Sequence, residues 1–389
     1  MMAGLPEGLL AIRGTTNLFL DSLRIRLSIA SPSSVFTRSA SRSGGVRNSY
    51  NSYQPAPPPV EEEPLQSVEV SSPSRLHLSL LDLNGDLGRI DGGLGVALRE
   101  PRLHLVAERA PSLSVTGPGK ELVHSYAQRF SAQHGIDGAK LTIKTSIPRH
   151  VGLGSGTQSA LVAGTALARI KGLERTPRQV AHDLGRGGTS GVGVAAFERG
   201  GFTVDGGHSF GPGQEKEMFL PSSASRAAPP PVLMRVAFPS SWRFVVVLPH
   251  TAPGIHGDSE KAVFAERCPV PRDAVESLCR LVLMKLLPAL VERDISGFGE
   301  AVTALRYEGF GRVGADLTPP RSIELVEHLL REGAAGAGIS SFGPAVYGIA
   351  EGARGARQLQ DSVMPHLFEG SKAFITQADN QGARIHPVN

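Results

Sequence analysis

Cysteine is nearly absent from this 389-residue chain. The two that occur, Cys268 and Cys279, cannot build a disulfide framework and form no CxxC pattern, so we expect a reducing compartment and a cytoplasmic location. Apolar runs are also short. None has the length that spans a bilayer, and we therefore expect no association with a membrane.

The chain also has a small net charge and few aromatic residues. The net charge is +4, long blocks of like charge do not occur, and aromatic residues make up 5% of the chain. These features argue against binding to nucleic acid, which relies on basic patches and stacking rings. The hydrophobic share of 40% is sufficient for a buried core, and the length corresponds to about two domains.

The segment 1–65 differs in composition from the rest of the chain. It is rich in arginine and serine, has few acids, and ends in a run of proline and glutamate that is typical of a linker. A targeting peptide, a disordered tail and a wrongly chosen start codon all account for this composition. We expect the folded part to divide into an N-terminal phosphate-binding lobe, residues 66–240, and a C-terminal α+β lobe, residues 241–389.

Hydrophobic spacing predicts strands and helices that do not alternate regularly. Strands are expected at 74–82, 95–98, 103–108, 141–145, 201–205, 242–248, 345–349 and 373–376. Helices are expected at 120–134, 157–171, 258–266, 271–292, 295–308 and 353–367. Another begins near Thr176 and Pro177, which suit the N-cap and first position. The mixture favours an α+β fold over a doubly wound parallel sheet.

A glycine-rich turn, Pro-Arg-His-Val-Gly-Leu-Gly-Ser-Gly-Thr at 148–157, opens the predicted helix at Thr157. Its glycines allow backbone N–H groups to point at one spot, and the helix adds free N–H groups and a positive dipole end. Such a turn suits a phosphate or pyrophosphate. Arg149 adds a charge at its rim, and the predicted cradle is made of Gly152, Gly154, Ser155, Gly156 and Thr157.

This turn matches neither of the two common nucleotide motifs. It lacks the lysine of a Walker A loop, and its glycine spacing differs from the dinucleotide fingerprint. A tight strand–helix turn without a ligand is the alternative interpretation. Two further glycine clusters, at 185–191 and 333–343, favour the anion site instead.

The spacing Pro-x3-Gly-Leu-Gly-Ser resembles the phosphate loop of the GHMP kinase superfamily. Residues 336–344, Gly-Ala-Gly-Ile-Ser-Ser-Phe-Gly-Pro, resemble its C-terminal glycine motif, which implies that Gly338 and Ser340 lie near the phosphate. The resemblance covers the chain from about residue 70 onward. It implies a two-lobed α+β fold, with a ribosomal-S5-domain-2-like N-terminal lobe and a ferredoxin-like C-terminal lobe.

One departure from that superfamily concerns its chemistry. In those kinases an aspartate follows a Ser-Gly pair by two residues and assists the attacking hydroxyl. Here the pair is Ser190 and Gly191, and the position of the aspartate is held by Gly193. The resemblance therefore implies that the phosphate cradle is kept and that kinase chemistry is lost.

Longer segments, at 74–85, 88–93, 185–198 and 204–208, resemble the β-ribofuranosylaminobenzene 5′-phosphate synthase family. That resemblance implies condensation of phosphoribosyl pyrophosphate with 4-aminobenzoate or 4-hydroxybenzoate, with release of CO2 and pyrophosphate. The product belongs to methanopterin-type cofactor synthesis, and a homodimer is the family expectation. A small-molecule kinase of the same superfamily and a non-catalytic anion-binding module are the alternatives.

This chemistry assigns roles to candidate residues as hypotheses. Departure of pyrophosphate calls for donors and Mg²⁺, for which Ser155 and Asp91 are candidate ligands. Asp82 or Asp91 would stabilise the cationic sugar, with turn capping as the alternative for each. Cationic groups in the glycine loops would hold anions, and a histidine follows a Gly-Gly pair. These candidates are Arg89, Arg149, Arg186 and His208: we expect Arg89 and His208 to be catalytic, with Asp82 and Asp91, and Arg149 and Arg186 to contact phosphate.

Overall fold

The computed structural model describes residues 65–250, 257–313 and 315–388. All of them belong to one compact unit, and the tail and linker expected at 1–65 lie almost entirely outside the described residues. Within these ranges, no helix combines the length and the apolarity needed to cross a bilayer.

The larger sheet is built on two long antiparallel strands, β1 (Ser67–Asp82) and β2 (Arg89–Arg109). Its path runs β12-β1-β2-β4-β3, and β5 and β6 also pair with β2 while β7 pairs with β5. The strands predicted at 95–98 and 103–108 are one continuous strand, because β1 pairs with both halves. The other members are β3 (Ser114–Thr116), β4 (Ala139–Thr145), β5 (Phe202–Asp205), β6 (His208–Ser209), β7 (Val232–Val236) and β12 (Arg384–Pro387).

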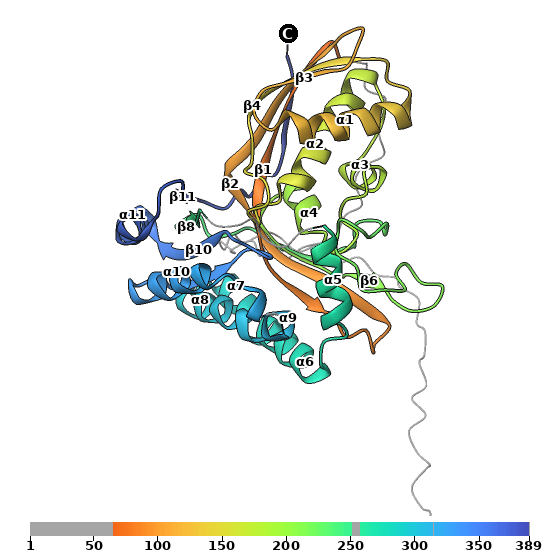
Figure 1. Cartoon of the computed structure of the whole chain (residues 1–389). Coiled ribbons are helices and arrows are strands. Elements are labelled where there is room, and N and C mark those ends of the chain that lie inside the picture. The colour runs from red at the N-terminus through yellow and green to blue at the C-terminus, as the bar shows by residue number, and fades with distance from the viewer. Residues whose placement is uncertain (1–64, 251–256, 314, 389) are drawn as a thin grey trace, which may run out of the picture. The chain divides into compact units, whose positions relative to one another are not determined.

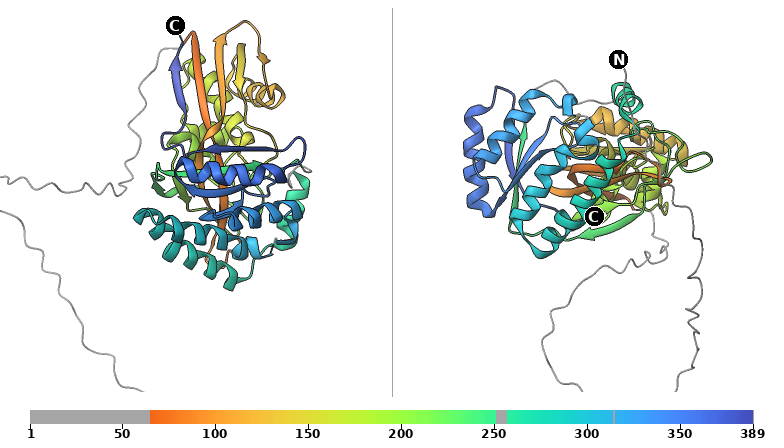
Figure 2. Two further views of the ribbon diagram at one scale, coloured as in Figure 1. Left: turned by 90° about the vertical axis from the view of Figure 1, so that its left-hand side faces the viewer. Right: turned by 90° about the horizontal axis from the view of Figure 1, so that it is seen from below.

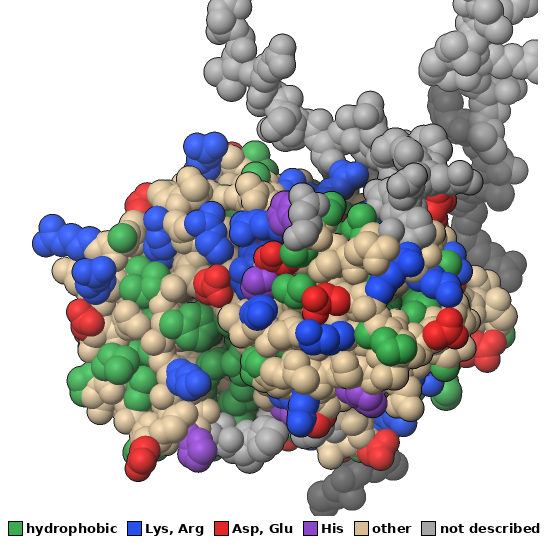
Figure 3. Space-filling model, turned by 90° about the horizontal axis from the view of Figure 1, so that it is seen from above, with side chains coloured by type: hydrophobic (Ala, Val, Ile, Leu, Met, Phe, Trp, Pro, Cys, Tyr) green, Lys and Arg blue, Asp and Glu red, His purple; other side chains and the backbone are tan. Residues whose placement is uncertain are grey.

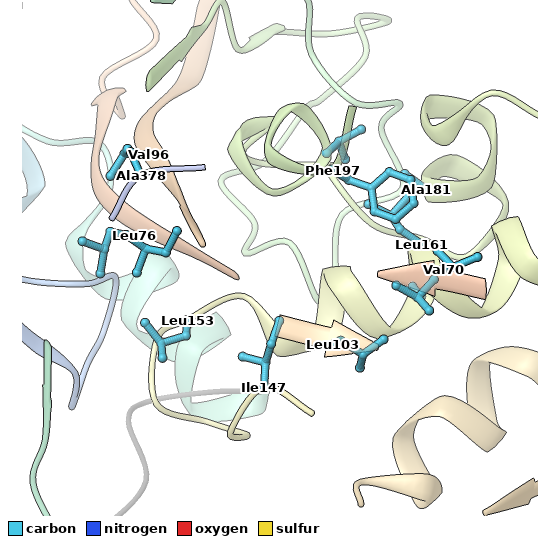
Figure 4. Packing of buried hydrophobic residues seen from close by; sticks show 14 of the residues in the cluster. Val70, Leu76, Val96, Leu103, Ile147, Leu153, Leu161, Ala181, Phe197 and Ala378 are labelled. Atoms are coloured by element: carbon cyan, nitrogen blue, oxygen red, sulfur yellow. The ribbon is translucent and has the colours of Figure 1, made fainter. Parts of the chain in front are cut away.

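Four helices cover one face of this sheet (Figure 1): α1 (Lys120–His134), α2 (Ser155–Lys171), α3 (Pro177–Asp183) and α4 (Val192–Glu198). Small residues let α2 pack closely; a Cβ at Gly164 would lie only 2.4 Å from Val180. The predicted cap of α3 is present, since Thr176 and Gln179 form a capping box. Figure 4 shows the shared core, in which Leu153 of the glycine-rich turn lies near Leu76 of β1.

The smaller sheet is antiparallel, with the order β11-β8-β10-β9. Its strands are β8 (Trp242–Leu248), β9 (Gly336–Ile339), β10 (Val346–Glu351) and β11 (Lys372–Thr376). Helices pack beside it (Figures 1 and 2): α6 (Arg272–Leu281), η1 (Val282–Leu286), α7 (Leu287–Glu292), α8 (Ile295–Ala304), α10 (Pro320–Arg331) and α11 (Gly352–Val363). The predicted α+β class is confirmed.

Short elements complete the described residues: α5 (Asp258–Arg267), α9 (Gly309–Val313), η2 (Leu305–Tyr307), η3 (Ala315–Leu317) and η4 (Met364–His366). After the smaller sheet, the chain returns to the larger one, where β12 pairs with β1 from Val68 to Ser71. The outer surface carries charges of both signs, and Figure 3 shows Lys and Arg side chains sharing one face with Asp and Glu.

Candidate active site

The glycine-rich turn connects β4 to α2 and presents the start of that helix to a cavity. Helix α2 begins at Ser155, two residues before the predicted start, and Gly154 is its N-cap with φ of 83°. Among the described residues no side chain caps this end, and its first turn holds no acidic residue. The backbone N–H groups at the start of α2 are therefore available to an anion.

This cavity, which we call the cationic cavity, has a volume of about 410 Å³. The structure brings together in its wall every predicted phosphate-binding residue of the first two glycine clusters: Arg149, Gly152, Gly154, Ser155, Gly156, Thr157 and Arg186. Arg75 and His77 of β1 line it too, and Glu260 of α5 is the carboxylate among its described lining residues. The wall is suited to a ligand with several negative charges.

Two arginines flank the turn from opposite elements. Arg186 donates from Nε and Nη2 to Thr157 Oγ1, at 3.3 and 3.2 Å, and Arg75 donates to the carbonyl oxygen of Gly152. Burial and the nearby Arg186 lower the pKa of Arg75 to about 10, and Glu260 opposes this shift. Arg75 is thus a cation at neutral pH. It was not among the residues predicted from the sequence.

The third glycine cluster, residues 333–343, holds the turn through hydrogen bonds of Ser340. Ser340 Oγ donates to the carbonyl of Gly152 at 2.6 Å and accepts the N–H of His77 at 2.9 Å. Gly152 has φ of 88°, and a Cβ there would lie 2.3 Å from the carbonyl oxygen of Ser340, so only glycine fits. Ser340 is fully buried and lies outside the lining of the cationic cavity, and Gly338 lies in β9 beside another cavity.

A hydrogen-bonded series leads from His77 to a buried carboxylate. His77 Nε2 lies 3.1 Å from Ser190 Oγ, which donates to Asp205 Oδ2 at 3.4 Å. Burial, with the neighbouring Arg75, lowers the pKa of His77 to about 3, so its ring is neutral at pH 7. Burial raises the pKa of Asp205 to about 6, although the hydrogen bonds that its carboxylate accepts from backbone N–H groups act to lower it.

Gly193 faces the turn at the position where the kinases carry an aspartate. A Cβ there would lie 3.0 Å from Thr157 Cγ2 and 3.5 Å from Thr157 Oγ1. The neighbouring Gln158 holds this position in place, because its Nε2 donates to the Gly193 carbonyl at 2.8 Å. A side chain at residue 193 would thus enter the cationic cavity, and none is present to act as a base.

The remaining candidates, Asp82, Arg89, Asp91 and His208, do not line the cationic cavity. Asp82 Oδ1 accepts the N–H groups of Asn84 and Gly85, which is the turn-capping alternative. Arg89 is exposed and donates to the carbonyl oxygens of Gly206 and Gly207. Catalytic roles for Asp82 and Arg89 stay predictions that this placement does not favour.

Asp91 and His208 form a buried network with Lys216. Asp91 Oδ2 lies 2.7 Å from His208 Nδ1 and 2.8 Å from Lys216 Nζ, and both acidic and basic side chains are almost inaccessible. Asp91 thus bonds to these two side chains and does not line the cationic cavity with Ser155, with which it was predicted to bind Mg²⁺. In the described ranges no group of three or more His, Cys, Asp or Glu side chains could hold a metal ion.

A second cavity, which we call the apolar cavity, lies beside the cationic one and has a volume of about 400 Å³. Both are lined by His77, Leu80, Ser341 and Phe342, which we call the shared wall. An extra residue, Leu78, produces a β-bulge in β1, since His77 pairs with Gly95 and Ser79 with Leu94. In a regular strand His77 and Leu80 would point to opposite faces; the bulge places both in the shared wall.

Comparison with known proteins agrees with this geometry. The family model for the N-terminal domain of GHMP kinases matches residues 121–201, and that for their C-terminal domain matches residues 286–369. Phosphomevalonate kinase from Streptococcus pneumoniae has a TM-score of 0.58 at 13% identity, covering 81% of this chain and all of that one. Mevalonate kinase from L. major has a TM-score of 0.56 at 14% identity, covering 79% and 95%. These structures share the fold.

Curated proteins found by sequence comparison are more similar to this chain than these kinase structures are. β-Ribofuranosylphenol 5′-phosphate synthase from Methanothermobacter thermautotrophicus is 43% identical over 325 residues, which cover 81% of this chain and 97% of the relative. The protein of that name from Archaeoglobus fulgidus is 40% identical over 321 residues, covering 82% and 99%. The chain therefore belongs to the β-ribofuranosylphenol 5′-phosphate synthase family, within the GHMP kinase superfamily.

Proposed function

We propose that this enzyme condenses phosphoribosyl pyrophosphate with 4-hydroxybenzoate or 4-aminobenzoate. A bond forms between C1 of the ribose and the ring carbon that carries the carboxylate. The bond from C1 to pyrophosphate breaks, and pyrophosphate keeps its electron pair. The carbon–carboxylate bond then breaks, its electrons restore the aromatic ring, and CO2 leaves. Charge and atoms balance without any further oxidant or reductant.

The cationic cavity carries this proposal. Pyrophosphate gains negative charge as it leaves, and donors aimed at that charge lower the barrier. The uncapped start of α2 and the side chains of Arg75, Arg149 and Arg186 supply such donors around one volume. Phosphoryl transfer to an alcohol is less well supported, because position 193 offers no carboxylate to the attacking hydroxyl.

His77 suits the cationic state of the sugar. The shared wall lies where a ribose bound next to the turn would react, and an imidazolium there would oppose a positive C1. Because burial keeps His77 neutral at pH 7, it adds no such charge. Through Ser190 it is also linked to the carboxylate of Asp205, which gives the series a negative end.

Mg²⁺ is part of the proposal, since it would neutralise pyrophosphate oxygens. Ser155 and Glu260, both in the wall of the cationic cavity, are the described side chains that would hold it together with the substrate. This replaces the predicted pair of Ser155 and Asp91. A homodimer also remains a proposal, which analytical ultracentrifugation of the purified chain would test.

The decisive experiment uses carboxyl-labelled substrate. Purified enzyme, phosphoribosyl pyrophosphate, Mg²⁺ and carboxyl-labelled 4-hydroxybenzoate or 4-aminobenzoate should release labelled CO2 and equimolar pyrophosphate. Absence of labelled CO2 with both benzoates would overturn the proposal. Formation of ADP from ATP with a small alcohol would instead identify a kinase, and ligand binding without turnover would identify an anion-binding module.

A further inference from the structure

The apolar cavity is not used by the pyrophosphate site described above. It is lined by residues of the strands β1, β9 and β10 and of the helices α8, η2, α9 and α10. Aliphatic and aromatic side chains make up much of its wall: Leu78, Val302, Leu305, Phe310, Leu317, Ile323 and Ile339. A dry cavity of about 150 Å³ is enough to hold a benzene ring. This larger cavity of about 400 Å³ has room for a substituted ring.

The two cavities differ in character and meet at the shared wall. The cationic cavity offers arginines and the start of a helix, whereas the apolar cavity offers aliphatic and aromatic side chains together with a few polar ones such as Arg306, Glu327 and Tyr347. Two ligands bound in these cavities would approach each other beside His77, Leu80 and Phe342. Such a pair of adjoining sites is what a condensation between a charged sugar phosphate and a flat ring requires.

We infer that the apolar cavity binds the aromatic acceptor, an arene carboxylate, with its carboxyl-bearing carbon at the shared wall. This inference rests on the proposed function and assigns its second substrate to named residues. The ring would be held mainly by apolar contact, which at about 25 cal/mol per Å² is a sufficient source of affinity for a small arene.

Tyr347 gives this cavity a polar group for the ring substituent. Its side chain is 2% exposed, lines only the apolar cavity, and carries a pKa that burial raises, so its hydroxyl stays protonated. Arg306 and Glu327 are further polar residues of this wall. A hydroxyl or an amine opposite the carboxylate could hydrogen-bond to such groups, whereas an unsubstituted ring would leave them without that contact.

Ile323 offers a direct test. It is half-buried on α10 and lines only the apolar cavity, so Ile323→Trp fills the cavity without touching the turn. Leu330 lies two turns further along the same helix and lines neither cavity, which makes Leu330→Trp the matched control. Dissociation constants for 4-hydroxybenzoate and for pyrophosphate are measured separately by calorimetry on the full chain.

We expect Ile323→Trp to weaken arene binding at least tenfold, with pyrophosphate affinity within twofold of wild type. Leu330→Trp should change neither constant. Arene binding that is unchanged in Ile323→Trp, or no arene binding by the wild-type chain, overturns the inference. Because binding is measured without turnover, these outcomes are separate from the labelled-CO2 assay, whose failure would overturn the proposed reaction alone.

A smaller substitution covers the case in which tryptophan disturbs folding. A Cβ at Gly338 would lie 2.6 Å from the Tyr347 hydroxyl oxygen, whereas one at Gly348 would lie 3.0 Å from Leu359 in the core of the smaller sheet. Gly338→Ala should weaken arene binding and Gly348→Ala should not, with thermal unfolding recorded for both. Equal effects of the two substitutions on arene binding would contradict the inference.

Discussion

Ser340 joins the glycine-rich turn to the first strand, since its hydroxyl donates to the Gly152 carbonyl and accepts the His77 N–H. Ser340 lies 188 residues after Gly152 and 263 after His77, so one fully buried side chain from the C-terminal part of the chain joins these two segments. The position of the turn, and with it the anion site, depends on this contact.

Ser340→Ala should destabilise the enzyme by roughly 1–3 kcal/mol, because it leaves the His77 N–H without a partner and removes one of the two donors to the Gly152 carbonyl, the other being Arg75. It should also weaken pyrophosphate binding, since the turn loses its support. Urea unfolding and calorimetry measure the two effects. Ser322→Ala is the control: Ser322 is equally buried, but its hydroxyl makes only a 3.4 Å contact with Pro344. Equal destabilisation by both substitutions would argue against this role of Ser340.

Arg186→Ala should raise the KM for phosphoribosyl pyrophosphate by about 10- to 100-fold, as expected when a charged hydrogen-bond donor worth about 1.5–3 kcal/mol is removed. Arg89→Ala should leave this KM unchanged, because Arg89 does not line the cavity and donates its hydrogen bonds to the carbonyl oxygens of Gly206 and Gly207. Steady-state kinetics of pyrophosphate release provide the comparison. A large effect of Arg89→Ala would restore the catalytic role predicted for it from the sequence.

Gly193→Asp should lower affinity for pyrophosphate at least tenfold, because the new carboxylate would stand beside Thr157 in an anion site. Gly193→Ala adds the Cβ without the charge and should have a much smaller effect. Calorimetric titration distinguishes the two. If alanine weakens binding as much as aspartate does, space and not charge decides the residue at this position.

His77→Gln should change how stability depends on pH. The folded pKa of His77 lies at about 3, below the ordinary value of 6.5, so its contribution to stability is present above pH 6.5 and is lost as the pH falls towards 3. Between pH 6.5 and 4.5 the wild-type chain should lose roughly 2 kcal/mol of unfolding free energy through this group. Unfolding curves across this range should be flatter for His77→Gln.

His124 provides the control for that measurement, because it is exposed on α1 and takes no part in the series from His77 to Asp205. His124→Gln should keep the wild-type dependence on pH. A His77→Gln profile that coincides with the wild-type profile would show that the buried ring is not neutral in the folded protein.

Removal of Mg²⁺ with a chelator should reduce CO2 release by at least tenfold, and added Mg²⁺ should restore it, because the leaving pyrophosphate would lose its neutralising cation. Glu260→Gln should raise the Mg²⁺ concentration needed for half-maximal rate, and Asp91→Asn should not, since Asp91 is engaged by His208 and Lys216. The reverse order of effects would return Asp91 to the metal site.

Most elements with strong local signals could be predicted from sequence, although the amphipathic helix α10 was missed. Helix α1 has the predicted bounds, and Thr176 caps α3 as expected. Helix α4 and strand β9 were not predicted, because the first has only seven residues after a glycine and the second reads Gly-Ala-Gly-Ile. Such short, small-residue segments take their structure from neighbours, as β9 does by pairing with β10.

In the site, too, features with a local sequence signal could be predicted, and features that depend on distant packing could not. The turn at 148–157 could be predicted because its glycines and helix start carry the anion-binding property locally. Arg75 could have been found from its place two residues before His77, on the same side of a strand. The burial of Asp91 beside Lys216 could not, since the pair lies 125 residues apart and depends on how loops pack.

At Leu78 the presence of an extra residue in the strand matters more than the chemistry of its side chain, because that residue forms the β-bulge. Successive side chains of a strand point to opposite faces of the sheet. One extra residue therefore moves every later side chain to the opposite face. Most apolar replacements at Leu78 should thus be tolerated, whereas its deletion should turn Leu80 away from the wall that both cavities share. Among related proteins, a single-residue gap at this point would be the more informative difference.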